Sequence, residues 1–252
     1  MSPLAIAHRG SRILWPENTL TAFEGAAALG YSWLETDVHL TADGALICLH
    51  DDTVDRTTDG AGLASDLKLA DIQRFDAGYR HDERFRGTGI RVPSLEEVVT
   101  ALPGCNLVID LKQDGLEAPL VEMVERFDLW DRIIVGSFSD RRLAEFRSLS
   151  EGRVRTSTGT RETLRAWARS WFGTPERFAD AVQVPRSHRG LPVVTRRTVA
   201  GFHRGEYEVH VWTVNAEAEM ERLLDWGVDG IITDRPDLLR SVFERRSLWP
   251  DQ

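Results

Sequence analysis

LAIAHRGSRILWPENTLTAF, residues 4–23, holds the pattern on which the predicted fold depends. The apolar run Leu4–His8 predicts a buried strand, which ends abruptly in the charged Arg9 and the turn-former Gly10. A helical pattern follows and predicts a helix over Thr19–Leu29. The segment is therefore a strand followed by a helix. An imidazole and a guanidinium stand at the carboxyl end of the strand, where they are suited to meet an anion.

The same strand–helix unit recurs nearly to the C-terminus. Ala216–Trp226 is another clear helical pattern. Repeated alternation of this kind predicts a parallel sheet, and eight units in 252 residues match the size of a TIM barrel. We expect strands at Leu4–His8, Trp33–Leu40, Ala45–His50, Asn106–Lys112, Arg132–Phe138, Val154–Ser157, Ala181–Val184, Val209–Val214 and Gly230–Thr233.

That set contains one strand more than a barrel needs. The tight-turn sequence TADG, residues 41–44, leaves no room for a crossover helix, so the runs on either side of it are predicted to form an antiparallel hairpin. The hairpin counts as one barrel unit and brings His50 back beside Glu35. The polar, Gly-rich stretch from about 51 to 93 is too long for an ordinary barrel loop. We therefore expect a (β/α)8 barrel over residues 1–252 as a single domain, with a small insertion after the second barrel strand.

Composition limits the partners and the location of the chain. The net charge of −9 disfavours an extended basic surface for nucleic acid or anionic lipid. No apolar run approaches the length of a membrane span, and no signal peptide is visible. Cys48 and Cys105 lie far apart and have neither redox nor disulfide spacing. The sequence predicts a cytoplasmic protein without nucleic acid partners or stable membrane association.

Acidic residues collect on two of the predicted strands. Glu35 and Asp37 are two positions apart, so their side chains share one face of a strand. Asp110 and Lys112 repeat that spacing on the strand NLVIDLK. An isolated pair of acids is more often a solvated strand edge, but carboxylates from adjacent strands are what Mg²⁺ or Ca²⁺ prefers. Glu35, Asp37 and Asp110 are therefore candidate ligands of a divalent metal.

Two histidines stand at predicted strand ends near these acids. Alone, His8 and His50 would each be expected to have structural roles. Together at the carboxyl edge of a barrel they become candidates for general acid and base, because the imidazole pKa lies near neutrality. Arg9 and Lys112 are predicted to bind the anion, Arg9 with a fork that matches phosphate oxygens.

Several segments together resemble the glycerophosphodiester phosphodiesterase family. The resemblance covers nearly the whole chain, in order, and its combination of H-R-G, P-E-N-T, E-x-D and H-D is specific. The segments that carry it are AHRGSRILWPENTLTAF (7–23), LETDVHLTADGALICLHDDTVDRTTDGAG (34–62), VPSLEEVV (92–99), LVIDLK (107–112), IIVGSFS (133–139), VHVWTVN (209–215) and WGVDGIITDRPDLL (226–239).

The resemblance implies a TIM barrel and a metal-dependent enzyme that cleaves glycerophosphodiesters to glycerol phosphate and an alcohol. It also implies His8 and His50 as acid and base, with metal bound by Glu35, Asp37 and the acid at 110. The family usually has Glu at the last position, and Asp110 is one methylene shorter. Trp212 is implied to form a wall of the substrate pocket, with a buried packing role as the alternative.

Two other functions fit the same barrel. One is a lysophospholipase D-like or cyclising phosphodiesterase, which would show an apolar rim where residues 51–93 are polar. The other is a non-catalytic phosphate-binding module, which would lack a histidine or an acidic ligand. Both histidines and all three acids are present, which favours an enzyme over a binding module. The net charge of −9, the polar insertion and the absence of a visible anchoring segment favour a small, water-soluble diester over a bilayer lipid, and its hydrolysis is the leading hypothesis.

A few further residues at the strand ends carry secondary predictions. Asn18 and Asn215 are expected to cap helices at their N-termini, and Asp234 is expected to cap the final helix. Ser137 and Phe138 end a predicted strand at the same edge as the candidate site, and we expect them to line it.

Overall fold

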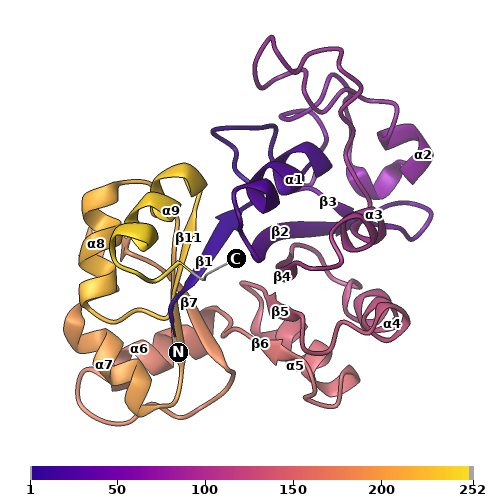
Figure 1. Ribbon diagram of the computed structural model, residues 1–252. Coiled ribbons are helices and arrows are strands. Elements are labelled where there is room, and N and C mark those ends of the chain that lie inside the picture. The colour runs from indigo at the N-terminus through magenta and orange to yellow at the C-terminus, as the bar shows by residue number, and fades with distance from the viewer. Residues whose placement is uncertain (1, 250–252) are drawn as a thin grey trace.

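The computed structural model describes residues 2–249, and these residues form a barrel of parallel strands surrounded by helices (Figure 1). Eight strands follow one another around the barrel, and the first pairs with the last in parallel register, Ile6 opposite Ile232. The strands are β1 (Leu4–His8), β2 (Trp33–Leu40), β4 (Asn106–Leu111), β5 (Ile133–Gly136), β6 (Arg155–Thr156), β7 (Ala181–Pro185), β10 (Glu208–Trp212) and β11 (Gly230–Thr233).

The barrel is nearly closed between β6 and β7. A parallel bridge joins Ser157 to Ala181, and the amide of Thr158 donates to the carbonyl of Ala181 at 2.9 Å. The predicted TIM barrel is therefore confirmed. Each predicted strand forms, with ends that differ by at most a few residues.

Apolar side chains fill the space on both sides of the strands. Inside the barrel Ile6, Val108, Ile134 and Ile232 form a small buried cluster. Outside it, a larger core packs the strands against the helices, because apolar residues at helical spacing face the sheet. The helices are α1 (Leu20–Ala28), α2 (Leu69–Ile72), α3 (Leu95–Ala101), α4 (Glu117–Phe127), α5 (Asp140–Leu149), α6 (Thr160–Ser170), α7 (Arg196–Arg204), α8 (Glu217–Asp225) and α9 (Pro236–Arg245).

The TADG turn joins β2 to an antiparallel partner, β3 (Leu46–Cys48), as predicted. Residues 51–93 follow and form the lobe that carries α2 and a short 3₁₀ helix, Ala64–Asp66, in Figure 1. This lobe packs on the end of the β2–β3 hairpin through a small apolar core, made of Ile47, Leu49, Val54, Ala64, Ile72, Ala77 and Val92. It also leads directly from His50, so it is attached at the rim of the barrel.

A second, shorter hairpin lies on the opposite side of the barrel rim. It consists of β8 (Ser187–His188) and β9 (Leu191–Pro192), which follow β7. None of the helices within residues 2–249 is long and apolar enough to span a bilayer.

Candidate active site

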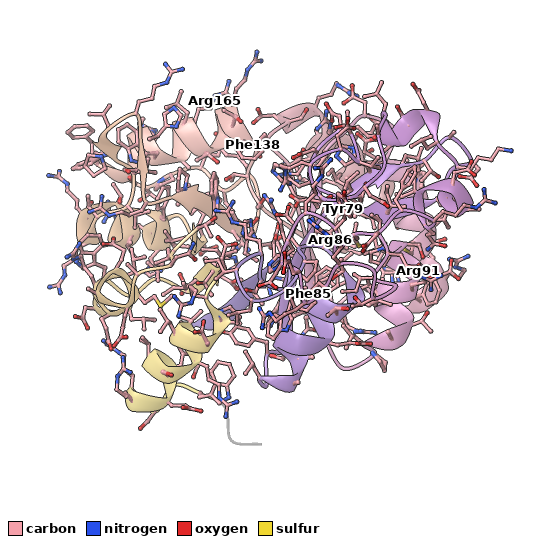
Figure 2. All side chains as sticks on the ribbon, turned by 90° about the horizontal axis from the view of Figure 1, so that it is seen from above. Tyr79, Phe85, Arg86, Arg91, Phe138 and Arg165 are labelled. Carbon is pink, nitrogen blue, oxygen red and sulfur yellow. The ribbon has the colours of Figure 1, made fainter. Side chains whose placement is uncertain are left out.

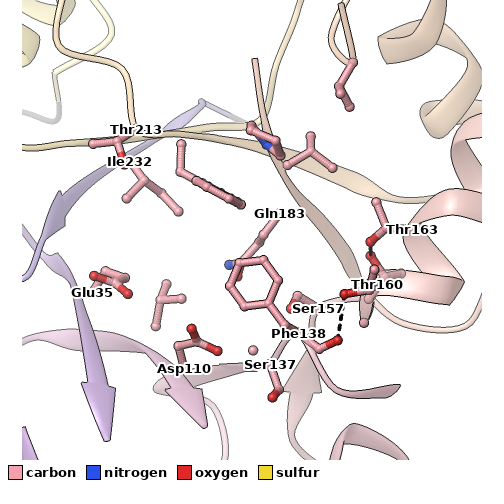
Figure 3. Close-up of a pocket in the computed structure, with 18 of the residues that line it drawn as sticks. Glu35, Asp110, Ser137, Phe138, Ser157, Thr160, Thr163, Gln183, Thr213 and Ile232 are labelled. Carbon is pink, nitrogen blue, oxygen red and sulfur yellow. Dashed lines mark hydrogen bonds between the residues drawn. The ribbon is translucent and has the colours of Figure 1, made fainter. Parts of the chain in front are cut away.

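One cavity of about 600 Å³ lies at the carboxyl edge of the barrel strands. Parallel strands present their carboxyl ends at the same edge, where barrel enzymes place their catalytic side chains. Figure 3 shows Glu35 and Asp110 on one side of this cavity and Thr160 and Thr163 across from them. Every site residue predicted from the sequence lines it: His8, Arg9, Glu35, Asp37, His50, Asp110, Lys112 and Trp212.

His8 is held at the end of β1 by the end of β11. Its Nδ1 lies 2.7 Å from Asp234 Oδ1, while Arg12 Nε and Asn215 Nδ2 donate to Asp234 Oδ2 at 3.0 and 2.9 Å. Burial opposes the charge of Asp234, but the hydrogen bond from His8 and the other donors lower its pKa to about 2. The ionised carboxylate can only accept, so His8 Nδ1 carries a proton. Its Nε2 is left 3.8 Å from Glu35 Oε2.

His50 has the same arrangement just after β3 of the hairpin. Its Nδ1 lies 2.6 Å from Asp51 Oδ1, and Arg56 Nε donates to Asp51 Oδ2 at 2.5 Å. Although partial burial opposes it, the bonds from Arg56 and His50 lower the pKa of Asp51 to about 2. Arg56 also binds Glu17 through two bonds of 2.8 and 3.0 Å. The inserted lobe thus supplies the group that holds His50 against the first barrel loop.

The three predicted metal ligands lie on adjacent strands. Asp37 of β2 is the register partner of Asp110 of β4, and Lys112 Nζ lies 2.7 Å from Asp37 and 2.6 Å from Asp110. Burial opposes the charge of Asp37, but Lys112 and Arg9 hold its pKa below the ordinary value. The pKa of Asp110 is raised, chiefly by burial. Lys112, predicted to bind the substrate anion, here neutralises two carboxylates.

Glu35 is the least compensated of these acids. It is buried, and in the described residues its side chain accepts one hydrogen bond, from the amide of Arg9 at 3.1 Å, while His8 Nε2 lies 3.8 Å away. Burial, reinforced by the charge of Asp37, raises the pKa of Glu35 to about 7. A further cation at this point would therefore be favourable.

The loop between β1 and α1 fixes Arg9 at the cavity. Arg9 adopts a left-handed conformation, φ 53°, and its guanidinium lies 2.9 Å from both Glu17 and Asp37. Gly10 follows at φ 76°, and a Cβ there would lie 2.6 Å from atoms of Ala22 in α1. Only glycine allows this close approach. Like Lys112, Arg9 is already paired with carboxylates.

The three predicted caps are wrong, and all three residues belong to the site. Thr19 caps α1, Ala216 precedes α8 without a side-chain cap, and Arg235 precedes α9. Asn18 instead donates to Asp37 at 3.1 Å. Asn215 donates to Asp234, and its Oδ1 accepts from the Asp234 amide at 2.8 Å. Side chains expected to satisfy helix ends thus orient the buried acids.

Apolar side chains also line the cavity, so the expectation of a rim without them is wrong. Ser137 and Phe138 line it as predicted, and Trp212 stacks edge-on against Phe138 with ring centroids 5.9 Å apart. Leu164 of α6 and Leu191 of β9 continue this wall. Figure 2 places Phe138 away from the inserted lobe, which carries Tyr79, Phe85, Arg86 and Arg91. The polar rim was predicted from residues 51–93 alone, whereas the apolar side chains come from other segments.

A parallel barrel with two carboxylate-bound imidazoles and a cluster of acids at its carboxyl edge defines a TIM-barrel hydrolase. Residues 8–238 match the Glycerophosphoryl diester phosphodiesterase family. The chain belongs to this family, whose members are phosphoric diester hydrolases.

Relatives match over almost the full chain. A probable glycerophosphodiester phosphodiesterase 2 of Mycobacterium tuberculosis is 38% identical over 98% of this chain and 92% of its own length. A glycerophosphodiester phosphodiesterase of Caldanaerobacter subterraneus is 31% identical over 97% of this chain and 99% of its own. The resemblance noted in the sequence is confirmed.

Solved structures agree with the fold. A glycerophosphodiester phosphodiesterase of Agrobacterium tumefaciens superimposes with a TM-score of 0.79 at 27% identity, covering 95% of this chain and 99% of that one. A phosphodiesterase of Oleispira antarctica, solved with the product sn-glycerol-3-phosphate, gives 0.82 at 27% identity, with coverage of 96% and 97%.

Proposed function

We propose that this chain hydrolyses glycerophosphodiesters to glycerol phosphate and an alcohol, with His8 and His50 as general acid and base. The observation that carries the proposal is that both imidazole rings are held by aspartates in the same way. Each has Nδ1 on an ionised aspartate, which leaves Nε2 of each as the nitrogen that exchanges protons. The family and the named activities of the relatives support the same substrate class.

The two imidazoles divide the proton transfers of the reaction. One removes the proton from the attacking oxygen, and the other gives a proton to the departing alkoxide. Asp234 and Asp51 hold the rings in the tautomer that this requires and stabilise each ring when it is charged. The guanidinium of Arg9 and the ammonium of Lys112 face the cavity and bind the phosphate oxygens.

The acids fit a divalent metal by their chemistry. Glu35, Asp37 and Asp110 offer hard oxygen donors from two adjacent strands, and the raised pKa of Glu35, caused by burial and by the charge of Asp37, supports binding of a cation there. No group of three or more metal-ligating side chains is already arranged around one point in residues 2–249. We propose that these three acids hold Mg²⁺ or Ca²⁺, which when bound would neutralise charge on the phosphate.

The remaining proposals concern the extent and location of the enzyme. We infer that residues 1–252 act as one phosphodiesterase domain, supported by the family match over 8–238. We also infer a cytoplasmic enzyme without stable membrane association. Both cysteines support this location, because each is buried and unpaired, and burial raises the pKa of Cys48 to about 12.

Release of glycerol phosphate from glycerophosphocholine and glycerophosphoethanolamine tests the proposal. The enzyme is assayed after exhaustive chelation and again with Mg²⁺ or Ca²⁺ restored. We expect hydrolysis of both diesters only with the metal present. Failure to cleave any diester under metal-replete conditions contradicts the proposed activity. Undiminished turnover after chelation contradicts the metal site alone.

A further inference from the structure

The cavity continues well beyond the catalytic groups into an arm with apolar walls. The arm lies between α6 and the β8–β9 hairpin, with Phe138 at its inner end. Phe138, Leu164 and Leu191 line it and remain 63%, 62% and 67% exposed. Three large apolar side chains left open to water around one cavity are costly unless a ligand covers them.

The walls of the arm are held in place by contacts of their own. Trp167 of α6 donates its indole N–H to the carbonyl of Val193 at 3.0 Å, which ties the hairpin to the helix. At the inner end the ring of Phe138 packs edge-on against Trp212. The arm is therefore a preformed groove, of the kind that binds ligands with little ordering cost.

The two ends of the cavity differ sharply in charge. Phe138 marks the boundary, since Lys112 Nζ lies 5.9 Å from its ring centroid and the acids lie beyond (Figure 3). Among the described lining residues from Phe138 to Thr213, none is Asp, Glu, Lys or Arg. The uncharged arm therefore begins directly beside the charged end of the cavity.

We propose that the arm binds an apolar chain carried by one of the two alcohols of the phosphodiester. The proposal rests on the proposed function and names its preferred substrates as single-chain amphiphiles. The charged end holds the phosphate, while Leu164, Leu191 and Trp167 cover the chain. A choline or ethanolamine head group would leave these side chains exposed.

A chain-length series tests this specificity. Diesters of glycerol phosphate with methanol, butanol and octanol place the chain on the leaving alcohol, and octanoyl lysophosphatidylcholine places it on the glycerol. All are assayed below their micelle-forming concentrations. We expect kcat/KM to be at least ~10-fold higher than for the methanol diester, either for the octanol diester or for octanoyl lysophosphatidylcholine, since about two buried methylenes account for that factor. The substrate with the higher kcat/KM identifies which alcohol carries the chain.

Variants assign the effect to the arm. Leu164→Asp and Leu191→Asp should each reduce the rise to less than ~3-fold, because a carboxylate disfavours an apolar chain beside it. Leu149→Asp is the matched control, since Leu149 is also an exposed helix leucine, 45% exposed on α5, and does not line the cavity. It should retain the full rise. Thermal unfolding confirms that each variant is folded.

Binding of a non-reacting probe gives a readout that does not depend on turnover. Octyl phosphate should bind at least ~10-fold more tightly than methyl phosphate by calorimetry, and Leu191→Asp should abolish the difference. Equal affinities overturn the inference, as does a flat chain-length series in an enzyme that cleaves glycerophosphocholine. An enzyme that cleaves no diester overturns the proposed function instead.

Discussion

His8 Nδ1 lies 2.7 Å from Asp234 Oδ1, and this bond joins the ends of the first and last barrel strands across 226 positions of sequence. The carboxylate is completely buried and also accepts from Arg12 Nε and Asn215 Nδ2, while Ser11 Oγ donates to the backbone carbonyl of Asp234 at 2.7 Å. Because this cluster keeps Asp234 ionised, it determines which nitrogen of His8 faces the cavity. The pairing of β1 with β11 therefore brings Asp234 to the ring of His8, which we propose as a general acid or base.

Replacing Asp234→Asn should lower turnover by ~10²-fold or more while the protein stays folded. An amide can donate to His8 Nδ1, which moves the imidazole proton to Nε2 and reverses the tautomer. Steady-state kinetics measure the loss, and ¹⁵N chemical shifts of the His8 ring report the tautomer. If Asp234 positions the His8 ring for catalysis, both the turnover and the tautomer should change.

Asp237→Asn is the matched control for that variant. Asp237 lies three residues further on and pairs with Arg235 at the start of α9, outside the cavity. The turnover of the Asp237→Asn variant should match that of the unmodified enzyme. If Asp234→Asn kept normal turnover with an altered tautomer, the ring orientation would not matter for catalysis.

The two histidines should each prove essential for turnover. Changing His8 or His50 to Ala is expected to lower kcat by ~10²–10⁴-fold, the usual size of an acid–base contribution. The double variant should lose less than the product of the single losses, because the two rings serve one reaction. His203→Ala, on α7 and away from the cavity, controls for loss of an imidazole. Near-normal turnover of either single variant would return that histidine to a structural role.

Much of this structure follows from local sequence patterns. Leu4–His8 and Gly230–Thr233 are short apolar runs, so both strands could be predicted with their ends. The TADG turn likewise fixed the β2–β3 hairpin, because no crossover fits in that length. Glu35 and Asp37 share a face by strand periodicity alone. These features depend only on residues close together in the chain.

Contacts between distant segments could not be read in this way. Asn18 and Asn215 precede helices and resemble caps, yet closure of the barrel places buried carboxylates within their reach, and these compete successfully for the amides. The apolar arm could not be predicted because its walls come from α6 and the β8–β9 hairpin, which are separate in the sequence and meet only in the folded barrel. Asp51 was missed for a different reason, since its charge looked like part of a polar loop.

Stability should depend on pH through His203. Its Nε2 lies 2.7 Å from Asp229 Oδ2, and this bond raises the His203 pKa above 6.5, with burial opposing. A histidine whose pKa is higher in the folded than in the unfolded protein stabilises the fold. This stabilisation is complete at pH values below the pKa of the unfolded state and is lost as the pH rises through the pKa of the folded state. His203→Gln should therefore lower Tm more at about pH 5.5 than at about pH 9. A Tm difference that is constant, or larger at high pH, would contradict this coupling.

Asp110→Glu should preserve at least part of the metal-dependent activity. It restores the residue that the family usually has there and keeps a carboxylate as the donor, although its longer side chain must share the space that Lys112 Nζ now occupies 2.6 Å from Asp110. Asp110→Asn is the comparison, since it keeps the size and removes the charge. We expect the Asp110→Glu protein to bind Mg²⁺ more tightly than the Asp110→Asn protein, as measured by calorimetry. The turnover of the two variants should follow the same order. Complete loss in a folded Asp110→Glu protein would show that the site is built around the shorter side chain, whereas equal Mg²⁺ affinity of both variants would remove Asp110 from the ligands.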